Sequence, residues 1–177
     1  MKIKKTRVVE SDLINKYLPA NYVDTFEVDF CTNRPVAADD VMIGFWTSAP
    51  EWVNWLFTLR DWLVKPFGIQ TGAAGKNNEL FEKAIREGGS YRFVEVVDKS
   101  DTETVIAADD KHLKMYLSVK AERVGEGHHN LRISTVVHFH NWLGRAYFAV
   151  ICLFHYFIVK NTIKTLVKKL YICGFCK

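Results

Sequence analysis

Alternating apolar and polar positions fill much of the middle of the chain and predict a β-sheet. In residues 22–31 the apolar positions of the alternation are Tyr22, Phe26, Val28 and Phe30. Extended runs follow at 91–97, 102–109, 112–124 and 131–140. A period of two puts successive side chains on opposite faces of a sheet. With a glycine-containing hairpin loop before the last run, these segments predict a first strand and at least four further antiparallel strands.

Two short helices are predicted between the first strand and the rest of the sheet. The first covers Pro35–Trp46, because a proline suits the first turn of a helix. The second begins at the capping box Ser48–Glu51 and carries a stripe of Trp and Leu residues. It ends at Pro66, because the residue before a proline disfavours helix. A polar segment at 77–89 is predicted to be partly helical.

The last predicted element is a long helix from about Trp142 to Leu170. Its first half is apolar almost all round, and its second half is amphipathic, with lysines off the apolar stripe. A helix that is apolar on every side has to be covered on every side, so we expect a buried core helix. The uncharged run Ala146–Val159 has 14 residues. Spanning a bilayer takes about 20 residues, so this run predicts no transmembrane segment.

This order of elements favours an α+β fold. A run of antiparallel strands with the helices segregated from it predicts a curved sheet that wraps on the long C-terminal helix. A chain of 177 residues has the size of one domain. We place this domain at residues 1–170 and a C-terminal tail at residues 171–177.

Charge is distributed unevenly along the chain. The net charge is +4, but residues 1–7 hold four basic groups and residues 160–177 hold five lysines, with no acid in either segment. The remaining body therefore carries a net negative charge. This pattern disfavours a nucleic-acid partner, which would need positive charge on one face of the body. The basic ends leave peripheral contact with an anionic membrane open.

The four cysteines predict no cofactor and no metal. Cys173 and Cys176 form a C-x-x-C pair, but one pair is only half of a four-ligand zinc site. Cys152 lies in the apolar helix and is expected to be a small core residue. Residues 1–18 show no secretory signal, since charged residues interrupt the apolar ones. With free thiols, the chain is expected to be cytoplasmic.

Polar side chains gather where the last strand meets the last helix. Asn141 is suited to cap the helix that starts at Trp142, and Gly144 lets another backbone approach the first turn. His140, Arg145 and Tyr147 lie beside them. These residues either fasten the strand to the helix or form part of a ligand site, and the sequence leaves both interpretations open.

A second polar group is predicted at the turn 109–112. Asp109 and Asp110 favour a turn because their carboxylates accept hydrogen bonds from nearby backbone N–H groups. They also offer Arg145 a carboxylate partner, and with His112 they are candidate ligand-binding residues. Nothing in the spacing indicates a metal site.

His155 is the isolated ionisable residue of the apolar half of the last helix. A histidine there is either a core residue with one hydrogen bond or a group that faces a pocket. In the second interpretation His155, His140 and Asp110 are the candidates for proton transfer.

Several segments together resemble a bacterial family known as domain of unknown function 2867. They are Tyr22–Phe26, Trp52–Arg60, Asp109–Leu113, Thr135–Val137, and His140–Tyr147 with His155. More broadly, the order of elements is similar to the START-like superfamily, the helix-grip fold of pollen-allergen proteins, polyketide cyclases and lipid-transfer domains. The resemblance covers about residues 18–165. It implies a sheet that grips the C-terminal helix around an apolar cavity, and it implies no established activity.

The first functional hypothesis is binding of a small apolar molecule, lipid-like or polyketide-like, between the sheet and the last helix. The expected cavity walls are Phe26, Phe30, Met115, Leu117, Phe148 and Phe154. One alternative is a cyclase- or isomerase-type enzyme that uses pocket His and Asp residues. Another is an interaction module whose apolar helix pairs with another chain, with a homodimer as one form.

Overall fold

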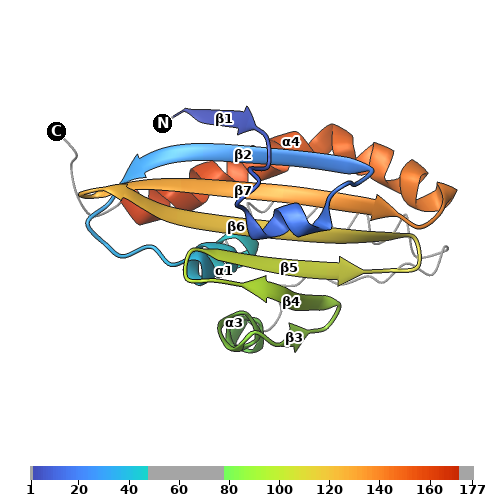
Figure 1. Ribbon diagram of the computed structural model, residues 1–177, viewed down its shortest axis with the longest axis horizontal. Coiled ribbons are helices and arrows are strands. Elements are labelled where there is room, and N and C mark those ends of the chain that lie inside the picture. The colour runs from blue at the N-terminus through green and yellow to red at the C-terminus, as the bar shows by residue number, and fades with distance from the viewer. Residues whose placement is uncertain (1, 48–77, 172–177) are drawn as a thin grey trace.

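The computed structural model describes residues 2–47 and 78–171, without the side chains of residues 78, 170 and 171. These residues form one antiparallel sheet of seven strands in the order β1-β2-β7-β6-β5-β4-β3 (Figure 1). The strands are β1 (Ile3–Thr6), β2 (Tyr22–Cys31), β3 (Ser90–Tyr91), β4 (Val94–Lys99), β5 (Glu103–Asp109), β6 (Leu113–Gly125) and β7 (His128–Phe139). The helices are the 3-10 helix η1 (Leu13–Tyr17), α1 (Ala38–Thr47), α3 (Asn78–Glu87) and α4 (Trp142–Tyr171).

The predicted α+β class is confirmed. The sheet is antiparallel throughout, and the long C-terminal helix α4 follows the last strand directly. The short helix α1 lies where the first of the two was predicted, and the helical part of 77–89 is α3. The second predicted short helix, from the capping box at 48–51 to Pro66, lies outside the described residues.

Two elements at the N-terminus were not predicted. Strand β1 pairs with β2 at the edge of the sheet, with Ile3 opposite Val28. The helix η1 lies over the sheet on the side away from α4 (Figure 1). Both have five residues or fewer, so neither is long enough to carry a clear hydrophobic period.

The sheet has two faces that differ in what covers them. We call the face under α1, α3 and α4 the helix face, and the opposite one the η1 face. Alternation along β2 points Phe26, Val28 and Phe30 to the helix face. There they join the main core, whose other buried members include Leu117, Val119, Leu131, Ile133, Val41, Met42, Phe81, Ile85, Val159, Ile163, Leu166 and Val167. A smaller cluster on the η1 face joins Ile14, Val105 and Val136.

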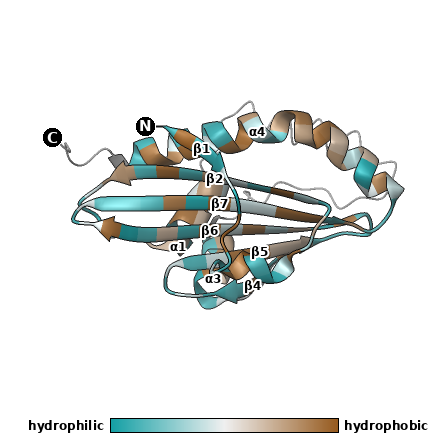
Figure 2. Cartoon of the chain, turned by 45° about the horizontal axis from the view of Figure 1, so that its top comes forward, coloured by the Kyte–Doolittle hydropathy of each residue, from teal (hydrophilic) through white to brown (hydrophobic). Residues whose placement is uncertain are grey.

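Helix α4 is divided into a covered half and an exposed half. Its C-terminal half buries Val159, Ile163 and Val167 in the main core. In the N-terminal half the side chains of Trp142 and Leu153 remain 78% and 71% exposed. Figure 2 shows hydrophobic colour along much of this helix. The expectation that the apolar half is a buried core helix is therefore wrong, because one stripe of the helix meets the sheet and its outer side is left uncovered.

The length and composition of α4 also differ from what was expected when no membrane-spanning segment was predicted. Within the described residues, the helical stretch Trp142–Lys169 is long and apolar enough to cross a bilayer, and 17% of its most apolar window is buried. The sequence estimate was shorter because it counted only the uncharged run 146–159, whereas the helix extends beyond this run at both ends.

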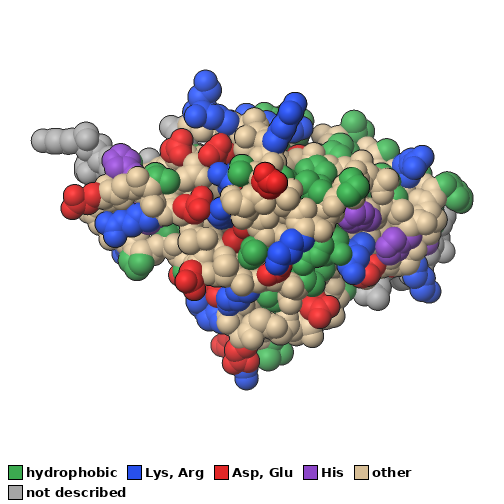
Figure 3. All heavy atoms as spheres, viewed as in Figure 1, with side chains coloured by type: hydrophobic (Ala, Val, Ile, Leu, Met, Phe, Trp, Pro, Cys, Tyr) green, Lys and Arg blue, Asp and Glu red, His purple; other side chains and the backbone are tan. Residues whose placement is uncertain are grey.

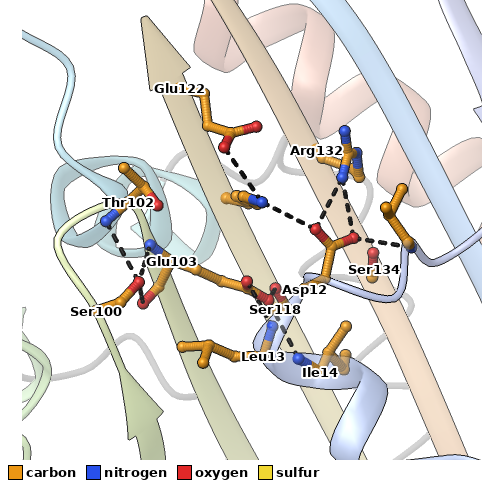
Figure 4. A network of polar contacts seen from close by, with 12 residues as sticks. Asp12, Leu13, Ile14, Ser100, Thr102, Glu103, Ser118, Glu122, Arg132 and Ser134 are labelled. Carbon is orange, nitrogen blue, oxygen red and sulfur yellow. Dashed lines mark hydrogen bonds and ion pairs between the residues drawn. The ribbon is translucent and has the colours of Figure 1, made fainter.

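A polar network holds η1 on the sheet (Figure 4). The Asp12 carboxylate accepts hydrogen bonds from Val9 N–H at 3.0 Å, from Lys120 Nζ at 3.0 Å and from Arg132 Nη1 at 2.8 and 2.9 Å. Burial alone would raise the pKa of Asp12, but these donors outweigh it and lower the pKa from its ordinary value. Asp12 is thus a paired anion that fixes the start of η1 to β6 and β7.

Glu103 completes this network from β5. Although it is almost fully buried, its carboxylate accepts from Leu13 N–H at 2.7 Å, Ile14 N–H at 3.2 Å and the Ser118 hydroxyl at 2.6 Å. The free N–H groups of the first helical turn are satisfied in this way. The network is a structural attachment, since its carboxylates are occupied by partners from the chain itself.

Candidate functional site

A second buried carboxylate lies on the helix face. Asp24 comes from β2, two residues before Phe26, so the alternation of the strand points it towards α4. His155 comes from the stripe of α4 that also carries Phe148 and Val159, at helical spacings of seven and four residues. The His155 Nε2 atom lies 3.1 Å from Asp24 Oδ2. Tyr22 donates its hydroxyl hydrogen to the same Oδ2 at 2.7 Å.

This cluster of Tyr22, Asp24 and His155 leaves polar atoms unsatisfied. The Asp24 side chain is 1% exposed, and its Oδ1 atom has no hydrogen-bond partner among the described residues. His155 Nε2 is close to Asp24 but lacks a hydrogen bond of acceptable geometry. Buried polar groups are nearly always hydrogen-bonded. Other buried atoms without a partner, such as Trp46 Nε1 and Arg132 Nε, are scattered over the described fold, whereas two of them lie together in this cluster.

Thr135 adds a third orphaned group next to Asp24. It lies opposite Asp24 in the register of β2 and β7, and its hydroxyl is buried without a partner in the described part of the chain. Directly opposed residues of an antiparallel pair have neighbouring side chains. The two side chains therefore offer a carboxylate oxygen and a hydroxyl to the same place under α4.

Aromatic rings surround the polar cluster. The ring of Tyr22 lies 4.7 Å from Phe148 and 6.0 Å from His155, centroid to centroid. Phe148 lies in turn 5.5 Å from Phe139. Such walls exclude water and strengthen the electrostatic interactions of any charge placed among them.

Tyr22 is held in its neutral form. Burial raises the pKa of its hydroxyl, and the hydrogen bond to Asp24 and the neighbouring Cys152 thiol raise it further. The phenol therefore remains a donor to Asp24 across the ordinary pH range. Cys152 was expected to be a small core residue, and it lies half-buried beside this phenol.

The predicted residues at the strand-to-helix joint form a fastening. Asn141 Oδ1 accepts from Gly144 N–H at 3.0 Å, which confirms Asn141 as the N-cap of α4. Its Nδ2 donates to the Lys111 carbonyl at 3.1 Å and lies 3.2 Å from His112 Nδ1. A Cβ atom on Gly144 would lie 1.9 Å from the His112 carbonyl oxygen, so the predicted close backbone approach is confirmed.

The Asp109 carboxylate of the 109–112 turn is paired with other groups than the expected Arg145. Asp109 lies 3.2 Å from Lys114 Nζ and 3.7 Å from His140 Nε2. Among the described residues no ion pair links it to Arg145, which is exposed. Asp110 takes part in the turn, where its N–H donates to the Leu113 carbonyl at 3.0 Å. The contact of Asp109 with His140 thus adds to the hydrogen bonds by which Asn141 ties this turn to the start of α4.

The three residues predicted for proton transfer do not come together. His140 and Asp110 lie at the start of α4, whereas His155 lies more than three turns along it, about 20 Å away at 1.5 Å per residue. Tyr147 is half-buried two turns before His155. Of the predicted site residues, His155 belongs to the buried cluster, and the others belong to the joint or its surroundings.

Sequence reasoning missed Tyr22, Asp24 and Thr135 as site residues. The sequence did contain a signal for Asp24. It lies between Tyr22 and Phe26 on the side of the strand whose other residues are apolar. An acidic residue on the buried face of a strand needs a partner that compensates its desolvation, or a function that justifies it. Of the expected cavity walls, Phe154 is wrong, since it lies on the outer side of α4 and is 46% exposed.

Another part of the described surface is hollowed but lacks an apolar lining with a few polar groups. An open hollow of about 540 Å³ lies by the β6–β7 hairpin, with Arg34, Arg123, Asp101 and Glu126 in its lining, so its charges are of both signs. None of the predicted site residues lines it. Within residues 2–47 and 78–171 no group of three or more His, Cys, Asp or Glu side chains is placed to hold a metal.

The family model described as "Protein of unknown function (DUF2867)" matches residues 17–162. The chain belongs to this family. The match contains Tyr22, Asp24, Thr135 and His155 as well as the joint around Asn141. No curated protein and no solved structure gives a significant match. The wider START-like relationship therefore stays a prediction from the sequence.

Proposed function

We propose that the protein binds a small, largely apolar molecule between the helix face of the sheet and the N-terminal half of α4. Tyr22, Asp24 and His155 are the polar anchor of the proposed site. The observation that carries the proposal is the presence of orphaned polar atoms on Asp24, Thr135 and His155 inside aromatic surroundings. Ligand sites commonly combine apolar walls with a few convergent polar groups.

The chemistry of the anchor narrows the class of ligand. Asp24 Oδ1 can accept a hydrogen bond, and its negative charge disfavours an anionic head group. The Thr135 hydroxyl can both donate and accept. A neutral, hydroxyl-bearing molecule, such as a polyketide-like or alcohol-type lipid, therefore fits the anchor better than a fatty acid.

Mass spectrometry of an organic extract from the purified protein tests this proposal. We expect a reproducible small molecule from the wild type and about fivefold less from His155→Leu, which loses a hydrogen bond to the ligand. His138→Leu is the matched control, because His138 lies on the η1 face, where its Nε2 is 3.0 Å from the Tyr17 carbonyl. It is expected to retain the molecule.

An empty wild-type extract, together with no binding of fluorescent hydroxylated or fatty-acid probes, overturns the proposal. Equal loss of the molecule from both variants also overturns it, because that result traces the loss to the fold. Circular dichroism and urea unfolding of each variant separate these cases.

The contact of His155 with Asp24 favours a second function, proton transfer of the isomerase or cyclase type. A carboxylate beside one ring nitrogen orients a histidine and leaves the other nitrogen to exchange a proton with a bound molecule. Here Nε2 faces Asp24, so Nδ1 is the exchanging atom. The test is deuterium uptake from heavy water into the bound molecule, which we expect from the wild type and not from His155→Leu. Binding without uptake leaves only the ligand-binding function.

A further inference from the structure

The outer side of α4 carries one continuous apolar stripe through the first half of the helix. Trp142, Val150, Leu153 and Phe157 are spaced by three, four or eight residues and so lie on one side. Their side chains are 78%, 56%, 71% and 58% exposed. An exposed apolar patch on this scale is characteristic of an interaction surface.

The same stripe becomes basic in the second half of the helix. Lys160, Lys164 and Lys168 continue the three- and four-residue spacing from Phe157. Lys5 of β1 joins them, since Lys160, Lys5 and Lys164 all lower the pKa of Tyr156 by their positive charge. Helix α4 contains no acidic residue. The stripe thus combines an apolar, aromatic end with a cationic end.

We propose that this stripe of α4 docks on the surface of a bilayer that contains anionic lipids. Trp142, Leu153 and Phe157 enter the boundary between head groups and acyl chains, as the apolar face of an interfacial helix does. The lysines contact lipid phosphates, which attract basic residues near a membrane surface. The opposite η1 face has acidic and basic side chains interspersed (Figure 3), and it lacks this separation of apolar and basic regions.

Two other occupants fit the stripe less well. In a pairing of two copies through α4, the lysines of each helix would meet either the lysines or the apolar side chains of the other, with no acid on either helix to pair with them. A spanning position would require α4 to leave the sheet. That would expose Phe148, Val159 and Ile163, which are buried in the fold, and would separate His155 from Asp24.

Vesicle co-sedimentation of the full chain tests the proposal. We expect binding to phosphatidylcholine vesicles with about 30% phosphatidylserine, weaker binding to pure phosphatidylcholine, and a decrease with rising salt. The double variant Leu153→Glu/Phe157→Glu should lower the partition coefficient about tenfold or more. Val124→Glu is the matched control, since Val124 is 63% exposed at the end of β6, and it should bind like the wild type.

Lys160→Gln/Lys164→Gln should weaken binding to the anionic vesicles about tenfold and leave the weak binding to neutral vesicles unchanged. Absence of wild-type binding at low ionic strength overturns the proposal, as does equal binding of the Leu153→Glu/Phe157→Glu variant. A wild-type dimer in light scattering that becomes a monomer in this variant assigns the stripe to a second copy instead. None of these results depends on a bound small molecule, so they test the docking surface separately from the proposed ligand site.

Discussion

Two buried carboxylates on opposite faces of the same sheet have opposite environments. On the η1 face, Asp12 faces Lys120, Arg132 and the Val9 N–H, so both of its oxygens accept hydrogen bonds. On the helix face, Asp24 accepts from the Tyr22 hydroxyl, while its other oxygen has no partner in the described part of the chain. Each side chain is 1% exposed.

A buried carboxylate stabilises this fold only where the chain supplies its partners. A buried anion is tolerated when paired cations and hydrogen bonds compensate its desolvation. Asp12 meets this condition and anchors η1, so it acts in stability. Asp24 meets it only in part, since one of its oxygens has no partner in the described part of the chain, and this is the environment on which the proposed ligand site depends.

Asp12→Asn should lower the free energy of unfolding by about 3 kcal/mol, because Lys120 and Arg132 are left without their shared anion. Urea denaturation measures this change. Glu87→Gln is the control, since the Lys83–Glu87 pair is exposed at 4.0 Å, and it should change stability by less than about 0.5 kcal/mol. Equal losses of unfolding free energy in the two variants would contradict a structural role for Asp12.

Acid should act mainly through the η1 face. The pKa of Asp12 is lower in the folded protein than its ordinary 3.8. The stabilisation it gives is therefore complete above its unfolded pKa and is lost as pH falls through its folded pKa. We expect unfolding free energy to fall below about pH 4 in the wild type, and less steeply in Asp12→Asn. Parallel curves for the two proteins would contradict this assignment.

His129 adds a separate contribution that both proteins share. Burial lowers its pKa, with a further decrease from Arg123 and His128. A base with a lowered folded pKa loses stability as pH falls below its unfolded value of 6.5. The contribution of His129 therefore cancels when the unfolding free energy of Asp12→Asn is subtracted from that of the wild type.

Tyr22→Phe should have a small effect on stability and a clear one on binding. It removes one hydrogen bond to Asp24 and keeps the ring contact with Phe148. The expected loss is about 1 kcal/mol in urea unfolding, with a measurable fall in the amount of co-purified molecule. A loss as large as that of Asp12→Asn would place the helix-face cluster among the stabilising elements.

The sequence was sufficient for those parts of the fold that depend on local periodicity. Alternation predicted the strands β2, β6 and β7, a proline suited to a first helical turn predicted α1, and the long apolar and then amphipathic run predicted α4. The residue types at the joint predicted the Asn141 cap and the close approach at Gly144. Each of these features depends on neighbouring residues or on one short contact.

The parts that were missed depend on contacts between distant segments. His155 and Asp24 are separated by 131 residues, and their meeting depends on which turn of α4 crosses β2. The attachment of η1 by Asp12 and Arg132 likewise joins residues 120 apart. The exposure of Leu153 was missed because hydropathy measures apolarity and does not tell what covers a side chain.

The unfolding free energy of Asp24→Asn tests the contrast between the two carboxylates most directly. Asn keeps an oxygen at the Oδ2 position that accepts from Tyr22 and places an N–H group at the Oδ1 position, while a buried charge is removed. We expect stability within about 1 kcal/mol of the wild type, or higher. A loss of about 3 kcal/mol, as for Asp12→Asn, would contradict the account by making Asp24 a second structural anchor.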